Sequence, residues 1–149
     1  MQSLFEPAAQ KAIVDRLTAL SSTSTRQWGK MEVGQMLAHC SAALEVGVGD
    51  RSRKQALIGK VFAPFVRTSL LGDKPFSKNS PTDPTFVVTD ARDFEREKQR
   101  LLELVARFCE RGAAAAGGQM HSFLGKIAGD EWGALMYKHL DHHLGQFGG

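Results

Sequence analysis

The chain has 149 residues, of which 42% are apolar, and its 19 basic and 16 acidic side chains give a formal charge of +3. Residues 1–149 are expected to form a single domain with its own core, because chains of roughly 100–200 residues usually fold as one unit. The composition excludes a disordered chain, and so small a charge excess gives no indication of a nucleic-acid partner.

Only two cysteines occur, Cys40 and Cys109. A disulfide scaffold would use many more in a shorter chain, so free intracellular thiols are expected. The first ten residues contain no apolar signal segment, and no uncharged stretch is long and apolar enough to span a bilayer. These features predict a cytoplasmic protein with neither a nucleic-acid nor a membrane partner.

The spacing of apolar residues predicts five helices separated by polar or glycine-containing breaks. They cover residues 7–20, 31–46, 52–71, 90–111 and 130–147. Pro7 fits the first turn of the first helix, Pro64 is expected to kink or interrupt the third, and Asp90 is expected to cap the fourth. The loop before Asp90 contains one possible short strand at residues 86–88. Four long helices after a short one indicate an all-α four-helix bundle with a short extra N-terminal helix.

The third predicted helix combines an apolar stripe with a basic polar side. Six apolar residues recur at steps of three and four: Leu57, Ile58, Val61, Phe62, Phe65 and Val66. Five basic residues lie in or just before the same segment: Arg51, Arg53, Lys54, Lys60 and Arg67. Binding to nucleic acid or to a membrane surface is one interpretation. A basic face that is merely solvated is the simpler one.

Three of the five histidines lie within residues 138–143. His139 and His143 are four residues apart, so on a helix they share one face and can bind one metal ion. At about 100° per residue, they fall in one stripe with Trp132, Met136 and Phe147. The apolar members of that stripe predict that both histidines point into the core, with His142 at its edge.

A third ligand would have to come from another part of the chain. His39 lies in the second predicted helix, on the flank of its apolar stripe, and His121 lies in the loop that leads into the last helix. Either side chain could complete a three-histidine site, and spacing alone does not choose between them. A pair of packed core histidines without metal is the alternative interpretation.

Several longer motifs resemble a known family. They are Lys30-Met31 with Gln35-Met36-Leu37-Ala38-His39-Cys40, Asn79-Ser80-Pro81-Thr82, His121-Ser122-Phe123-Leu124-Gly125-Lys126, Glu131-Trp132-Gly133, and the segment from Tyr137 to Phe147. Together they resemble a bacterial family of unknown function within the DinB/YfiT-like superfamily of metalloenzymes. The resemblance extends from about residue 28 to residue 147.

The resemblance implies a four-helix bundle with a buried three-histidine metal site, often in a homodimer. The ligand positions of that superfamily match His39, His139 and His143 here, so the resemblance selects His39 over His121. Three imidazoles favour a divalent transition metal such as zinc or nickel over magnesium or calcium. Some members of the superfamily use low-molecular-weight thiols, which implies a thiol-dependent transferase acting on a small molecule.

Several features of the site stay open at this stage. Hydrolysis is the second reaction that such a metal would support. His121 is expected to line the substrate pocket, and no residue is assigned as general acid or base. The alternative to an enzyme is a non-catalytic bundle that binds metal, or that serves as an interaction module.

Overall fold

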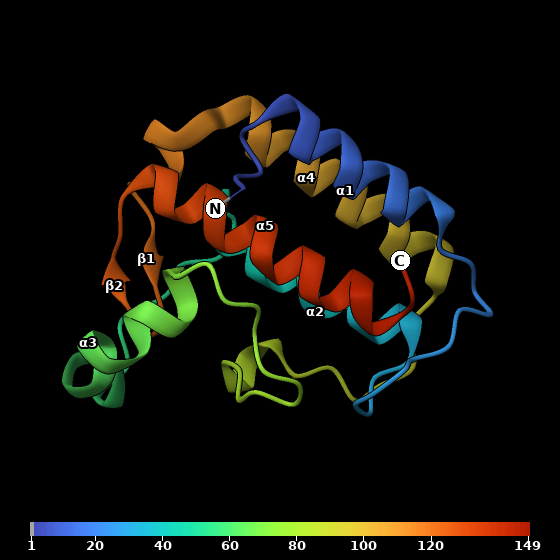
Figure 1. The fold of residues 1–149 in the computed structure, drawn as a ribbon, viewed down its shortest axis with the longest axis horizontal. Helices are drawn as coiled ribbons and strands as arrows, with labels where there is room; N and C mark the ends of the chain where they lie inside the picture. Colours follow the sequence, from blue (N-terminus) through green and yellow to red (C-terminus); the bar gives the residue numbers. More distant parts are fainter. Residues whose placement is uncertain (1) are drawn as a thin grey trace.

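The computed structural model describes residues 2–149 and is almost entirely helical. Its elements in chain order are α1 (Pro7–Ala19), α2 (Val33–Gly47), α3 (Leu57–Leu71), the 3-10 turn η1 (Pro84–Phe86), α4 (Phe94–Ala116), β1 (Met120–His121), β2 (Gly125–Lys126) and α5 (Gly129–Gln146). Figure 1 shows α1, α2, α4 and α5 running alongside one another. The predicted all-α bundle is confirmed, but α1 is one of its four helices and α3 is the extra one.

The core of the bundle lies between these four helices. Trp132 and Phe108 are its largest fully buried side chains. Helix α2 is buried on nearly every side, because α4 and α5 both pack against it. No helix in residues 2–149 is long and apolar enough to cross a membrane.

The helix ends follow local capping chemistry. Pro7 begins α1 as predicted. Helix α2 begins at Val33, where the Gln35 side-chain oxygen accepts the Glu32 backbone N–H at 2.8 Å. The predicted cap of α4 is wrong: Asp93, not Asp90, accepts the Arg96 backbone N–H at 2.8 Å. Helix α4 also continues past the predicted end to Ala116, across a kink at Gly112 with φ of 74°.

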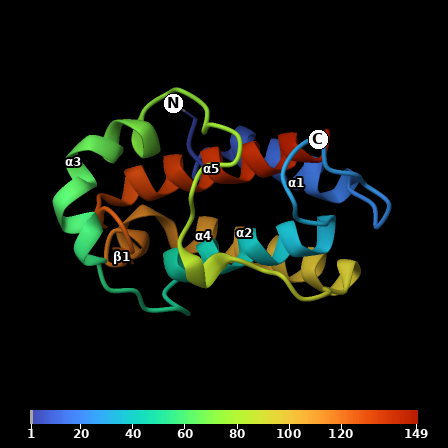
Figure 2. The same ribbon diagram turned by 90° about the horizontal axis from the view of Figure 1, so that it is seen from below.

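Helix α3 lies outside the bundle, at one end of the molecule (Figure 2). It begins at Leu57, five residues later than predicted, because the preceding segment is extended and the Ala56 backbone N–H bonds to the Ser122 carbonyl at 2.8 Å. The helix continues through Pro64 without interruption. Of its six apolar stripe residues, all except Val66 are exposed.

Two short elements differ from the prediction. Residues 86–88 do not form a strand, since Phe86 ends η1 and residues 87–88 are irregular. The hairpin of β1 and β2 was not predicted, because each strand has only two residues and shows no alternation. The hairpin leads directly into α5 and holds the start of α3, whereas η1 lies against α2.

Candidate metal centre

Three histidines from two helices converge between α2 and α5. His39 comes from α2, and His139 and His143 come from successive turns of α5. One ring nitrogen from each lies within 4.8 Å of the other two. The Nε2 atoms of His39 and His139 are 3.0 Å apart. The structure thus brings together the three histidines that the resemblance selected.

The position of the α5 pair follows from its apolar neighbours. Trp132, Met136 and Phe147 are all buried, as the stripe predicted. His143 is buried with them, and His139 keeps a part of its surface accessible. On α2, His39 is buried although it lies on the flank of the apolar stripe, because that helix is enclosed by its neighbours.

Two outer hydrogen bonds orient the imidazoles. His39 Nδ1–H donates to the Phe86 carbonyl at 2.9 Å, and His143 Nδ1–H donates to Gln146 Oε1 at 3.0 Å. The Gln146 amide is fixed in turn, since its nitrogen donates to the Trp28 carbonyl at 2.8 Å. An imidazole that donates through Nδ1 has a bare lone pair on Nε2. The two bonds therefore leave Nε2 of His39 and of His143 free to accept.

Burial keeps all three imidazoles neutral near pH 7. It lowers the pKa of His39 below its usual value of 6.5, against a smaller opposing effect of the hydrogen bond to Phe86. It lowers the pKa of His143 to about 3. The pKa of His139 lies well below 6.5, first because of burial and then because of the neighbouring histidines. Neutral imidazole is the form that binds a metal.

These donors fit a transition metal. Tetrahedral ligation at 2.0–2.1 Å places two nitrogens about 3.3 Å apart. The separation of His39 and His139 is close to that value, and all three ring nitrogens lie within 4.8 Å of one another. Ligating histidines commonly donate their other nitrogen to a carbonyl or amide oxygen, as His39 and His143 do here. Without a cation, His139 Nε2–H can donate to His39 Nε2, and the Nε2 lone pair of His143 is left without a hydrogen-bond donor among residues 2–149. The cluster can therefore hold a metal ion.

The outer partners were not found from the sequence. Gln146 lies three residues after His143 on the same helix, a spacing that places two side chains together. That spacing was the one feature of the sequence that could have identified Gln146 as a partner of His143. No feature of the sequence points to the Phe86 carbonyl, because the position of a backbone oxygen 47 residues from His39 depends on the path of a loop.

The remaining polar neighbours lie beside the centre. The half-buried His142 ring is 5.0 Å from the His143 ring and 5.7 Å from the rings of both Trp28 and Phe76. Asp141 faces solvent and forms an ion pair with Arg16 at 2.7 Å. Cys40 is a buried thiol whose pKa is raised by burial, and it lies outside the cluster.

His121 lies in the hairpin. Its Nδ1 accepts the backbone N–H groups of Phe123 and Leu124, each at 3.0 Å, so the ring holds the hairpin turn. Its ring centre is 5.7 Å from that of Trp132, and burial lowers its pKa to about 4. It is not part of the three-histidine cluster. Its expected role in a substrate pocket stays a prediction.

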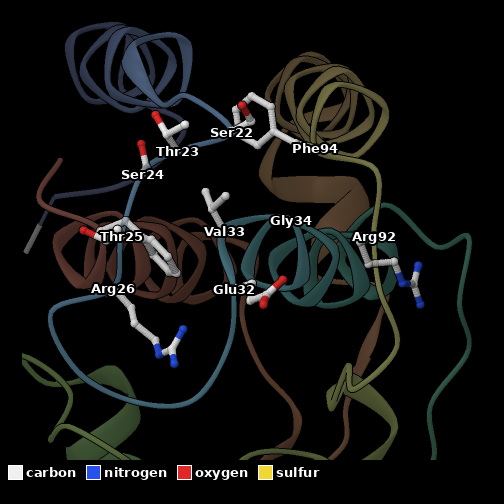
Figure 3. Close-up of a pocket in the computed structure, with 11 residues that line it drawn as sticks. Ser22, Thr23, Ser24, Thr25, Arg26, Glu32, Val33, Gly34, Arg92 and Phe94 are labelled. Atoms are coloured by element: carbon white, nitrogen blue, oxygen red, sulfur yellow. The ribbon is translucent and has the colours of Figure 1, made fainter.

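A surface hollow of about 670 Å³ lies where the α1–α2 loop passes the starts of α2 and α4. Four hydroxyl residues at positions 22–25 line it, and none of the three histidines does. Figure 3 shows Arg26 and Arg92 on opposite sides of the hollow. Arg92 forms ion pairs with Asp90 and Glu97, so the two positive charges do not converge on one point.

Comparison with known proteins gives one match. The family model described as "Protein of unknown function (DUF1569)" matches residues 3–148. Neither the curated proteins nor the solved structures contain a match.

Proposed function

The chain belongs to the DUF1569 family, whose function is unknown, and we propose that it is a metal-dependent enzyme of the DinB-like superfamily. The main support for this proposal is that His39, His139 and His143 converge, and that hydrogen bonds from Nδ1 orient two of the three rings. By the sequence resemblance to that superfamily, the same three positions correspond to its ligand positions. We propose zinc or nickel as the metal, because imidazole nitrogens suit both.

The charge of the site supports an anionic substrate group. The described cluster contains three neutral histidines and no carboxylate. A divalent ion held there would keep its full charge of two, which attracts an anion to the open position. When bound, the metal would act as a Lewis acid that lowers the pKa of a water or thiol reaching it.

A thiol fits this site better than water does. A free thiol has a pKa of about 8.5 and bulk water one of about 15.7, so the thiol needs far less help to lose its proton. No Asp or Glu joins the described cluster to serve as a base for water. We therefore propose a low-molecular-weight thiol as co-substrate and transfer of that thiol to a small electrophile.

The chain's own residues would hold and orient the reactants. The Phe86 carbonyl and the Gln146 amide fix the His39 and His143 rings, while His139 keeps the accessible surface of the cluster. Beside them, the His142 ring contacts the rings of Trp28 and Phe76. Burial of the centre limits the access of water to it.

The test begins with metal content. Untagged protein is analysed by plasma mass spectrometry beside a His39→Ala, His139→Ala, His143→Ala triple variant, with His142→Ala as the matched control. We expect about one equivalent of a transition metal in the native protein and the control, and none in the triple variant. Circular dichroism shows whether each variant is folded.

Turnover is tested with the metal that is found. The loaded protein is screened for transfer of thiols to electrophiles and, in parallel, for hydrolysis of ester and amide substrates. Transfer that requires both thiol and metal supports the proposal. Stoichiometric metal without turnover would indicate a non-catalytic metal-binding bundle. A native protein that stays metal-free after reconstitution with zinc and nickel would refute the metal site.

A further inference from the structure

Helix α3 presents an apolar face that nothing in the structure covers. Leu57 and Phe65 are 80% and 79% exposed, and three more apolar residues of the same helix are at least 48% exposed: Ile58, Val61 and Phe62. Together they expose roughly 600 Å², at the upper end of the largest apolar patches found on monomeric proteins. We call these five residues the α3 patch. Such a surface indicates an interaction site.

The exposed side is distinct from the side that packs on the protein. At about 100° per residue, the α3 patch spans an arc of about 140°, with Phe65 near its middle. The opposite side contains the residues that contact the rest of the molecule: Gly59, Ala63, Val66 and Leu70. Helix α3 is therefore apolar on two sides, and only one of them contributes to the fold.

The helix is fixed in this orientation at both ends. A Cβ atom on Gly59 would lie 2.4 Å from the Phe123 carbonyl, so the helix backbone rests directly on the hairpin turn. At the other end, Lys138 Nζ donates to the carbonyls of Ser69 and Gly72 at 2.6 and 2.9 Å. These contacts hold the α3 patch outward.

Positive charge borders the α3 patch. Residues 51–72 contain five basic side chains and no acidic one. Three of the five are already ion-paired, Arg51 with Glu45, Arg53 with Asp83 and Arg67 with Glu131. Lys54 and Lys60 have no ion-pair partner within residues 2–149 and supply the free positive charge. Lys60 lies about 60° around the helix from Leu57, between the patch and the protein-facing side. The patch is thus apolar in its middle and cationic at its rim.

We propose that α3 docks the protein on an anionic lipid surface, independently of the chemistry at the metal centre. A helix that lies in a membrane interface places aromatic and aliphatic side chains among the acyl chains and lysines at the headgroups. A second copy fits less well, because two α3 patches face to face would bring their lysines together without an acidic partner on either helix. Nucleic acid would leave Phe65 and Leu57 uncovered.

The test uses vesicles and two pairs of variants. Sedimentation with phosphatidylglycerol–phosphatidylcholine vesicles is compared with pure phosphatidylcholine vesicles. The apolar variant is Ile58→Ser with Phe65→Ser, matched by Val87→Ser, an exposed apolar residue outside the patch. The charge variant is Lys60→Glu, matched by the exposed Lys30→Glu. Because the mutated side chains face solvent, we expect unchanged circular dichroism and metal content.

We expect binding to the anionic vesicles only, and weaker binding at high salt. The apolar variant should lose at least tenfold in binding. Lys60→Glu should lose about ten- to thirtyfold, since each basic residue near an anionic surface contributes about 1 kcal/mol and the reversal removes two charges. Both control variants should bind like the native protein.

Three results would overturn the proposal. The first is binding to neutral vesicles that equals binding to anionic vesicles, or no binding to vesicles of either kind. The second is a concentration-dependent dimer in sedimentation equilibrium that the apolar variant abolishes, which would make the α3 patch an interface between copies. The third is salt-sensitive binding to duplex DNA in the absence of vesicle binding.

Discussion

The contact between Gln146 and His143 allows a direct test of how the metal centre is oriented. Gln146 is 3% exposed, and its amide joins the His143 Nδ1–H to the Trp28 carbonyl. The Gln146→Met variant keeps the length of the side chain and removes both hydrogen bonds. His143 Nδ1–H then has no acceptor, and the ring can rotate. The Nε2 lone pair is no longer held in its inward orientation.

The variant should have two separable effects. Loss of an outer partner of a ligating histidine typically weakens metal binding 10- to 100-fold, or by about 1.4–2.8 kcal/mol. A buried donor left without an acceptor costs the apoprotein about 1–3 kcal/mol of unfolding free energy. Since bound metal stabilises only the folded state, the metal-loaded variant should lose more stability than the apoprotein does.

Zinc affinity is measured by competition with a chromophoric chelator, and stability by urea unfolding with and without zinc. Gln99→Met is the control, because Gln99 is exposed on α4 and bonds only to Glu103. A zinc affinity within twofold of native, together with a less stable apoprotein, would refute the reasoning. Gln146 would then only pack the end of α5.

Three further predictions concern stability. Burial lowers the pKa of His121 to about 4 and of His143 to about 3, below the unfolded value of 6.5. The contribution of these two neutral histidines to the unfolding free energy should be complete above pH 6.5 and lost as pH falls toward their folded pKa values. In urea unfolding of the apoprotein, the loss should be about 3 kcal/mol per pH unit for the pair. An unfolding free energy that stays constant from pH 7 to pH 5 would contradict this. Gly112→Ala should destabilise the protein by about 1 kcal/mol, because a residue with a side chain is strained at the φ of 74° found there. No atom lies within 4 Å of the new Cβ, so the cost comes from the backbone alone. An unchanged melting temperature would show that α4 relaxes. Lys138→Met should lower the unfolding free energy by about 1.5–3 kcal/mol, because it removes hydrogen bonds from a charged group to the last carbonyls of α3. Amide hydrogen exchange should become faster only at that end of α3. Faster exchange throughout the protein would indicate a general loss of packing.

Helix α5 could be predicted from the sequence because its evidence is local. Trp132, Met136, His143 and Phe147 repeat with the helical period, and all four are buried. Periodicity fixes which side chains share a face, and the apolar members show where that face points. Both α5 histidines of the centre could thus be found without a structure.

The third histidine could not be found in the same way. His39 lies 100 residues before His139, and nothing local relates the two. His121 was equally acceptable by spacing, and only the resemblance chose between them. The structure shows His121 bound to the hairpin backbone instead. That hairpin has two-residue strands, which are too short to produce a pattern.

Helix α3 shows a second limit of periodicity. Its apolar stripe correctly predicted a helix, but a stripe does not indicate whether the protein itself or another surface covers it. The residues that pack on the protein are smaller on average and include Gly59 and Ala63. The larger side chains, including Phe62 and Phe65, face outward. Hydrophobicity alone therefore could not show which side of α3 packs on the protein and which side stays exposed.

The metal centre and α3 are linked through α5. Lys138 caps α3 through the Ser69 and Gly72 carbonyls, and His139 is the next residue on α5. Successive helical residues point about 100° apart, so one turn of α5 holds the outer helix with one side chain and the metal centre with the next. Helix α5 also packs on α1, α2 and α4, so its backbone is held in place without α3. We therefore expect Lys138→Met to loosen the end of α3 and to leave zinc affinity at the native value. A fall in zinc affinity in this variant would show that the position of His139 depends on α3.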